Sequence, residues 1–356
     1  MNRKTVVFLL LAIILLAIAL TLFCMQSPSD VEKPPAPRLW EDASFQASLA
    51  KSGKRGLQGI AVVAPASGLS DENARKALEM AGRLDIRLSA DAMRYGVVPY
   101  TANSDSARLE QLLQALNDSE TEVLWAVRGG YGSSRLLAEL AKSAKPETAK
   151  IFVGYSDLTF LHLFLHQWGW RTVHGGMFWE LSGTEEGHDV ENYRLLASLL
   201  AGELDELRYD GLKPFNSAAE ALSRPVEGLI IGGNLTCLAA AVGTPWPPEG
   251  SGKILFLEDV KEKGYKLDRM LVQLKEAGIF DGVGAVILGD FTKGDDNVDF
   301  ALERFAKELS APVFRTDLFG HGRKNYPLIL NGRAVIEKTS GDGNAFGLRM
   351  DAKQLP

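Results

Sequence analysis

The sequence predicts an α/β protein with two α/β domains, the first of them doubly wound, behind an N-terminal transmembrane segment. Three observations indicate this: an uncharged apolar run at the N-terminus, short β-branched runs that alternate with amphipathic stretches, and a polar break between two such series. The chain has 356 residues, of which 46% are hydrophobic and 24% charged. It is too long for one small core and too apolar for disorder, so we expect about two domains.

The apolar run covers residues 5–24, which include no charged residue, no Gly and no Pro. A helix of about 20 residues spans about 30 Å, the thickness of a hydrocarbon core. A cleaved signal has a shorter apolar region and small residues at the cleavage site, whereas Phe23 stands here beside Cys24. The pattern favours an uncleaved anchor, with a cleaved signal or a lipidated Cys24 as alternatives. Arg3 and Lys4 favour a cytoplasmic N-terminus, so we expect the remainder to be exported to the periplasmic or extracellular face.

The composition divides the rest of the chain. Residues 1–25 form the anchor or signal, and residues 26–50, with four prolines, are expected to be a linker. The first α/β domain then takes residues 51–201, a polar linker residues 202–225, and the second domain residues 226–356.

The elements follow from the alternation of the two patterns. In the first domain we expect strands at 57–64, near Ile86, at 122–127 and at 150–155, and helices at 71–82, 105–116, 134–142 and 157–168. In the second domain we expect strands at 226–231, 254–257, 285–288 and around Val313, Val335 and Leu348, and helices at 235–242, 267–277 and 298–309. Both series are typical of βα units on a largely parallel sheet.

Charge and cysteine content exclude several classes of protein. Thirty-nine Lys and Arg against 45 Asp and Glu leave a net charge of -6, which argues against nucleic acid as a partner. Two cysteines form neither a disulfide framework nor a four-ligand zinc site.

Residues 150–159 place an apolar strand directly before Ser156 and a helix. Such a corner is typical of a nucleophile elbow, in which the serine is exposed and the amide after it, here that of Asp157, faces an oxyanion. Gly154 matches the first glycine of the elbow pattern, while Leu158 stands at the second. The structural alternative is that Ser156 or Asp157 only caps the helix.

A glycine-rich turn at residues 126–134 also joins a strand to a helix, so its amides could face an anion. It lacks the Lys and Ser/Thr of a P-loop, and close packing of the helix on the sheet is the alternative. In a doubly wound sheet both turns lie at the carboxyl edge, where ligands bind.

A serine nucleophile needs a base, and His321 lies between glycines in a loop at residues 317–327. Glu258 and Asp259 follow four apolar residues at a strand end, so either carboxylate could orient the imidazole; a solvated strand end is the alternative. His162 and His166, spaced i and i+4, suggest a zinc helix, but the glutamate of that motif is missing.

Taken in order, seven motifs resemble the LD-carboxypeptidases, the murein tetrapeptide carboxypeptidases of the serine peptidase group that also contains microcin C immunity hydrolases. The motifs are Ala-Val-Val-Ala-Pro-Ala-Ser at 61–67, Arg-Gly-Gly-Tyr-Gly at 128–132, Gly-Tyr-Ser-Asp at 154–157, His-Gly-Gly-Met at 174–177, Gly-Gly-Asn-Leu at 232–235, Leu-Glu-Asp at 257–259 and Gly-His at 320–321. The resemblance covers residues 57–350. It leaves the role of Ser67 open.

The resemblance implies a Ser-His-Glu triad of Ser156, His321 and Glu258, with the amides of Gly130 and Asp157 as the oxyanion hole. It implies release of the terminal D-alanine from a muropeptide tetrapeptide, in peptidoglycan turnover or recycling, without metal or cofactor. A homodimer is expected from the same resemblance. Many relatives act in the cytoplasm, whereas the anchor here implies an exported enzyme.

Two other functions remain open at this point. A membrane-tethered two-domain solute-binding protein would share the anchor, the tether and the two lobes, but would have no use for a triad. A peptidyl-nucleotide amide hydrolase would share the fold and the triad and differ only in its substrate.

Overall fold

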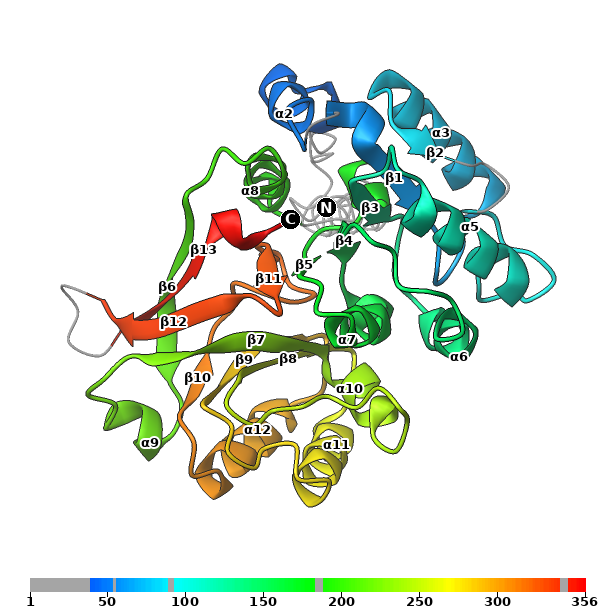
Figure 1. Ribbon diagram of the computed structural model, residues 1–356. Helices are drawn as coiled ribbons and strands as arrows, with labels where there is room; N and C mark the ends of the chain where they lie inside the picture. Colours follow the sequence, from blue (N-terminus) through cyan, green and yellow to red (C-terminus); the bar gives the residue numbers. More distant parts are fainter. Residues whose placement is uncertain (1–38, 54–55, 89–92, 183–187, 340–344) are drawn as a thin grey trace, which may run out of the picture. The chain divides into compact units, whose positions relative to one another are not determined.

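The computed structural model of the protein describes residues 39–53, 56–88, 93–182, 188–339 and 345–356. These residues form one compact unit, with an N-terminal half built on an open sheet and a C-terminal half built on a barrel (Figure 1). The predicted membrane segment at 5–24 lies outside the described residues. Within the described ranges, no helix has the length and apolar character needed to cross a bilayer.

The sheet of the N-terminal half has the strand order β11-β5-β4-β3-β1-β2. The five strands of this half are parallel, and β11, which comes from the C-terminal half, runs antiparallel to β5. The strands are β1 (Ile60–Val63), β2 (Arg87–Leu88), β3 (Val123–Ala126), β4 (Ile151–Gly154), β5 (Thr172–His174) and β11 (Leu328–Leu330). The predicted parallel sheet is therefore confirmed. Strand β11 forms its edge beside β5.

Helices cover both faces of this sheet, which confirms the doubly wound prediction. On one face Met80 of α3 packs in the same core cluster as Val62 and Trp125, and on the other Leu112 of α5 packs with Val63 and Leu124. The helices of this half are α2 (Ala43–Leu49), α3 (Asp71–Arg83), α5 (Asp105–Asn117), α6 (Leu137–Leu140), α7 (Thr159–Gln167) and α8 (Val190–Leu200). Short 3₁₀ turns are η2 (Leu39–Glu41), η3 (Gly56–Gly59), η4 (Ser133–Leu136), η5 (Ser156–Leu158) and η6 (Phe178–Ser182).

The C-terminal half is a closed barrel in the order β10-β6-β13-β12-β7-β8-β9. Strands β7 to β10 are parallel and the remaining pairs are antiparallel. The strands are β6 (Glu206–Pro214), β7 (Val226–Asn234), β8 (Ile254–Val260), β9 (Ala285–Thr292), β10 (Val313–Arg315), β12 (Arg333–Lys338) and β13 (Phe346–Asp351). The helices are α9 (Ser217–Glu220), α10 (Leu235–Ala241), α11 (Gly264–Glu276) and α12 (Val298–Glu308), with η7 (Ala352–Gln354) near the end.

The predicted linker at 202–225 is wrong, because it contains β6 and α9. Leu207 and Tyr209 are buried in alternation, as in a strand with one face on a core. The pairing of β6 with β13 shifts register at Asp210, which is followed by Gly211 with φ 107°. This irregularity breaks the alternation and makes the stretch look polar and aperiodic in the sequence.

The prediction that the linker extends to residue 50 is also wrong in its last part. Asp42 caps α2 by accepting a hydrogen bond from the Phe45 amide at 2.9 Å. Phe45 and Leu49, four residues apart on one face of α2, are fully buried, and α2 packs against α8. The fold therefore begins by Leu39.

The two halves share a core. One cluster of buried residues joins Trp125 and Val173 of the sheet to Phe256 of the barrel and to Phe319. The loop at residues 316–327 leaves the barrel at β10 and enters the sheet as β11. It is thus anchored at both ends, one in each half.

Candidate active site

Ser156 occupies the corner between β4 and α7 with φ 65°, a left-handed backbone conformation. A residue other than glycine in this region is strained, and such strain is typical of a nucleophile elbow. The corner leaves no room for side chains nearby: a Cβ on Gly129 would lie 2.9 Å from Cβ of Ser156, and one on Gly154 would lie 3.2 Å from Cβ of Ala126. The backbone thus has the strained corner that was predicted for an elbow. A serine that only capped the helix would not require this corner.

The glycine turn after β3 lies beside this corner. Gly130 has φ 103°, and a Cβ there would lie 2.3 Å from Oγ of Ser67. The Ser67 hydroxyl donates to the carbonyl of Tyr100 at 2.7 Å and accepts from the amide of Tyr131 at 3.0 Å. Ser67, whose role the sequence left open, therefore fixes the peptide that follows Gly130.

Asp157 ties the elbow to the same turn. Its carboxylate accepts from the amide of Ser133 at 2.8 Å, and its carbonyl accepts from the Ser133 hydroxyl at 2.5 Å. Burial raises the pKa of the Asp157 carboxyl. The amides of Gly130 and Asp157 donate no hydrogen bond within the part of the chain that the structure describes, and both belong to turns at the carboxyl edge of the sheet. They meet the requirement of an oxyanion hole for unused donors.

The C-terminal half contributes a histidine and a carboxylate. Nδ1 of His321 lies 2.6 Å from Oε2 of Glu258, which is completely buried on β8. Burial opposes the charged imidazole, but the charge and hydrogen bond of Glu258 outweigh it and raise the pKa of His321 above 6.5. With Nδ1 engaged by Glu258, Nε2 is left as the atom for proton transfer.

Close packing holds the His321 loop over this carboxylate. Gly320 has φ 125°, and a Cβ there would lie 3.1 Å from Cβ of Glu258. The Gly320 amide donates to Oδ1 of Asn325, an oxygen that also lies 3.1 Å from Nε2 of His174. The structure thus brings together His321 of the glycine-flanked loop and Glu258 of the strand end, as predicted.

Asp259, the other half of the acidic pair, has a different environment. It accepts from Nδ2 of Asn234 and from the amide and hydroxyl of Thr236 at the start of α10. Burial and the neighbouring Glu258 raise the pKa of Asp259 to about 6. Asp259 therefore stabilises a helix start, whereas Glu258 pairs with the imidazole.

Ser156 and His321 line one cavity of about 870 Å³, together with Gly129, Gly130 and Tyr155. Within the described residues no hydrogen bond joins the Ser156 hydroxyl to His321, a contact that is often long before substrate binds. The cavity thus holds a nucleophile from the sheet and a base from the barrel.

The sequence missed Glu180, which lies at this cavity. Its carboxylate accepts from the hydroxyls of Tyr155 and Tyr193 at 2.7 Å each and from the amide of Met177 at 2.8 Å. The Tyr155 ring centroid lies 4.8 Å from that of His321. A single acidic residue inside the apolar run at 177–181 was the available signal.

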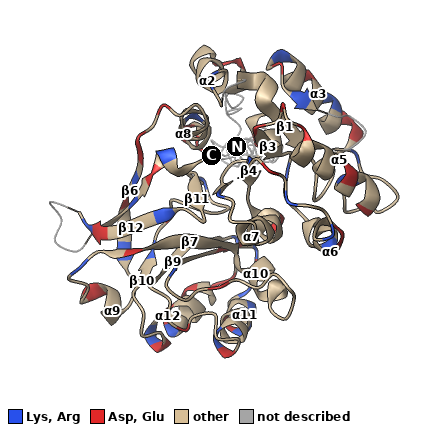
Figure 2. Cartoon of the chain, in the orientation of Figure 1, with Lys and Arg blue, Asp and Glu red and all other residues tan. Residues whose placement is uncertain are grey.

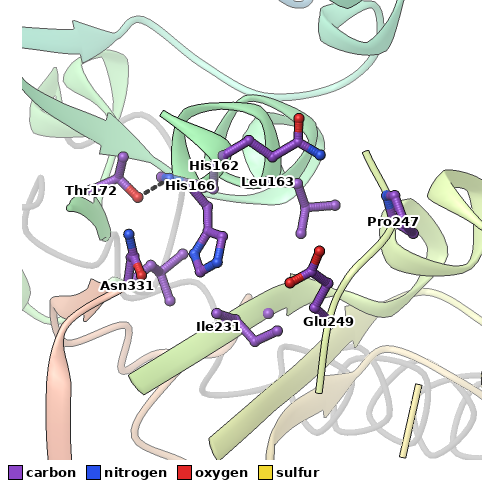
Figure 3. Close-up of a pocket in the computed structure, with 11 residues that line it drawn as sticks. His162, Leu163, His166, Thr172, Ile231, Pro247, Glu249 and Asn331 are labelled. Carbon is purple, nitrogen blue, oxygen red and sulfur yellow. Dashed lines mark hydrogen bonds between the residues drawn. The ribbon is translucent and has the colours of Figure 1, made fainter. Parts of the chain in front are cut away.

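The two histidines that suggested a zinc helix lie on α7. His162 contacts Oγ1 of Thr172 at 2.7 Å (Figure 3). It also contacts the carbonyl of Gly154 at 2.9 Å, at the end of the strand that leads into the elbow. His166 lies one turn further along α7, at a separate cavity of about 20 Å³, room for about one water molecule. In the ranges that the structure describes, no group of three or more His, Cys, Asp or Glu could hold a metal ion.

Comparison with known proteins shows the family to which the chain belongs. The model of the LD-carboxypeptidase N-terminal domain matches residues 60–175, and that of the LD-carboxypeptidase C-terminal domain matches residues 227–336. The chain is 42% identical over 281 residues to the "Putative carboxypeptidase" of Rickettsia conorii, covering 79% of this chain and 88% of that one. It is 33% identical over 294 residues to the murein tetrapeptide carboxypeptidase of Pseudomonas aeruginosa, covering 78% and 92%.

Solved structures show the same fold. The muramoyltetrapeptide carboxypeptidase from Oxalobacter formigenes superimposes with a TM-score of 0.69 at 29% identity, covering 84% of this chain and 99% of that one. An MccF-like protein from Streptococcus pneumoniae in complex with AMP superimposes with a TM-score of 0.66 at 20% identity, covering 83% and 99%. At that identity the second likeness concerns the fold alone.

Proposed function

Because the chain belongs to the LD-carboxypeptidase family, we propose that it is a serine LD-carboxypeptidase that releases the terminal D-alanine from muropeptide tetrapeptides. The observation that carries the proposal is the cavity shared by Ser156 at a strained elbow and by the hydrogen-bonded pair of His321 and Glu258. The names of the Pseudomonas and Oxalobacter relatives support the choice of substrate.

The reaction divides between the two halves of the site. Oγ of Ser156 attacks the carbonyl carbon of the bond between the diamino acid and D-alanine, and Nε2 of His321 takes the hydroxyl proton. The amides of Gly130 and Asp157 donate to the oxyanion. The C–N bond then breaks as His321 returns the proton to the leaving amine, and water hydrolyses the acyl-enzyme.

Glu258 acts through the imidazole. Its hydrogen bond to Nδ1 fixes the tautomer and stabilises the imidazolium that forms during attack. Complete burial of Glu258 keeps water from competing for that bond. Apart from the water that hydrolyses the acyl-enzyme, the scheme uses only side chains and amides of this protein, and it invokes neither metal nor cofactor.

The test is incubation of the full-length protein, in detergent if required, with the tetrapeptide L-Ala-γ-D-Glu-diaminopimelate-D-Ala. We expect free D-alanine and the tripeptide, measured by mass spectrometry, and no change on addition of EDTA. A peptidyl adenylate serves as the competing substrate, because peptidyl-nucleotide hydrolysis is the alternative within this fold. Preference for the adenylate, or stoichiometric binding of the tetrapeptide without turnover, would overturn the proposal.

We propose further that residues 5–24 anchor the enzyme in the membrane with its catalytic halves exported. The support is the length of the uncharged run and the positions of Arg3 and Lys4 before it. The protein should then remain in the membrane pellet after a carbonate wash, and added protease should digest it in spheroplasts. Protection from that protease would exclude this orientation, and a soluble mature form would replace the anchor with a cleaved signal.

A further inference from the structure

Two lysines at the cavity have an unusual backbone. Within the described residues, six non-glycine residues have positive φ, and three of them are Asp or Asn, which tolerate this conformation. The other three are Ser156 (φ 65°), Lys261 (62°) and Lys293 (59°), and all three line the same cavity. Strain that is retained at a site points to a function there.

The lysines follow the ends of adjacent parallel strands. Lys261 comes directly after β8 and Lys293 directly after β9, and the amide of Lys261 donates to the carbonyl of Thr292 at 2.9 Å. This bond holds the two strand ends side by side. Both side chains are exposed at the cavity, so both amines can reach a ligand from solvent.

The charge around this cavity is opposite to that of the whole chain. The chain carries -6, yet the lining residues include four cations against the single carboxylate of Glu180. The cations are Arg128, Lys261, Lys293 and Arg323. Elsewhere Figure 2 shows both signs interspersed, for example on α11 and α12, where Lys275 pairs with Glu308.

None of these four cations forms an ion pair within the described residues, and Glu180 already accepts hydrogen bonds from Tyr155, Tyr193 and Met177. A cavity with uncompensated positive charge favours an anionic ligand. A lysine ammonium is a compact charge with three donors on a flexible stem, so it can pair with a carboxylate without a fixed geometry.

The position of the lysines indicates which carboxylate they bind. Glu258, which holds the imidazole that protonates the leaving amine, lies on β8 three residues before Lys261. Arg128 instead precedes Gly129 and Gly130, on the side of the nucleophile and the oxyanion hole. The lysines thus come from the strands on the leaving-group side.

We propose that Lys261 and Lys293 bind the free terminal carboxylate of the leaving residue, and so restrict the enzyme to the last peptide bond. The inference rests on the proposed carboxypeptidase function. The triad acts on the scissile bond and does not by itself select the last peptide bond. The inference assigns this selection to the two lysines.

The experiment compares two substrates, the tetrapeptide with a free terminal carboxylate and the same peptide with a terminal amide. The wild-type protein should prefer the acid in kcat/KM by about 25-fold, about fivefold for each exposed lysine. The double variant Lys261→Gln/Lys293→Gln should lose this preference by cleaving the acid more slowly while cleaving the amide within about twofold of wild type. Lys307→Gln, which removes one positive charge at an exposed site on α12, should leave both rates unchanged.

The outcomes separate the two proposals. If wild type cleaves neither substrate, the carboxypeptidase function is wrong and the inference is wrong with it. If wild type cleaves the acid but the double variant keeps the preference, or loses both rates equally, only the role of the lysines is wrong. If Arg128→Gln loses the preference instead, Arg128 and not the two lysines binds the terminal carboxylate of the substrate.

A glycine variant of Lys261 distinguishes a role of its amine in substrate binding from a role of its backbone in stability. Lys261→Gly removes the amine and relieves the left-handed strain, so its preference for the acid should fall while its melting temperature holds or rises. A variant that lost stability and kept the preference would show that Lys261 has only a structural role.

Discussion

The two halves of this protein bring catalytic groups to one cavity in different ways. The sheet half supplies Ser156 and the glycine turn from the carboxyl edge of parallel strands, where local backbone geometry decides the position of each group. The barrel half supplies Glu258 from a strand and His321 from a loop that is 63 residues further along the chain. The nucleophile side is therefore local in sequence, and the base side depends on long-range packing.

The difference shows in what holds each group. Strain and glycine contacts fix the Ser156 corner within a few residues, whereas the His321 loop is fixed by β10 at one end and by β11, across the sheet, at the other. The core that joins Trp125 to Phe256 makes this possible, because it keeps the halves in one arrangement. Substitutions at the Ser156 corner should thus have effects on activity and stability that differ from those of substitutions around His321.

The largest effect is expected at the nucleophile. Ser156→Ala should lower turnover of the tetrapeptide by about 10⁴-fold or more, since it removes covalent catalysis. Its melting temperature should stay near that of wild type, and Ser156→Gly should be more stable than Ser156→Ala, because glycine relieves the strain at φ 65°. Exposed Ser119→Ala is the control. A Ser156→Ala protein with about a tenth of wild-type turnover would show that Ser156 is not the nucleophile.

On the base side, Glu258→Gln should lower kcat/KM by roughly 10²- to 10⁴-fold and also move its pH profile. The free base form of His321 is needed for attack, so activity falls as pH drops through its pKa, which Glu258 raises above 6.5. Without that charge, burial dominates and lowers the pKa, and the acid limb of kcat/KM should move to lower pH.

The control for this shift is Asp259→Asn, because Asp259 titrates at about 6 and could produce a limb of its own. If the limb belongs to His321, it persists in Asp259→Asn with at most a small shift. An acid limb that stays in place in Glu258→Gln, or moves to higher pH, would contradict the assigned pair.

The same contrast explains what the sequence could and could not predict. The elbow at Ser156 and the glycine turn were predictable, because a strand, a glycine and a helix start within ten residues determine them. Glu258 and Asp259 are both buried, and only their partners, His321 for one and Thr236 for the other, separate their roles. The family resemblance selected Glu258, and the local pattern alone did not.

The closed barrel could not be predicted either, because it depends on contacts between strands far apart in the sequence. Its closure depends on β6, whose alternation is interrupted at Asp210, and on pairing between β6 and β10 about a hundred residues apart. Similarly, β11 joins a sheet whose other strands all precede residue 175. Such pairings are set by the packing of the whole unit and leave little local signal.

The sheet half should also depend on residues that the sequence assigned to the linker. Phe45→Ala, which empties a fully buried site between α2 and the core, should cost about 3–5 kcal/mol of unfolding free energy. Phe300→Ala, at a side chain that is 68% exposed, should cost less than about 0.5 kcal/mol. Urea unfolding followed by circular dichroism measures both. Equal losses would mean that α2 is not part of the core.

The smallest effect is expected at the contact between the halves. Tyr155→Phe removes the hydroxyl that donates to Glu180 but keeps the ring beside His321, so stability should fall by about 1–2 kcal/mol. Tyr193→Phe removes the second hydroxyl on the same carboxylate, and should cost a similar amount. Because only Tyr155 packs against the imidazole, a fall in kcat of several-fold is expected in Tyr155→Phe and not in Tyr193→Phe. An unchanged kcat in both variants would show that Glu180 supports the fold without positioning His321.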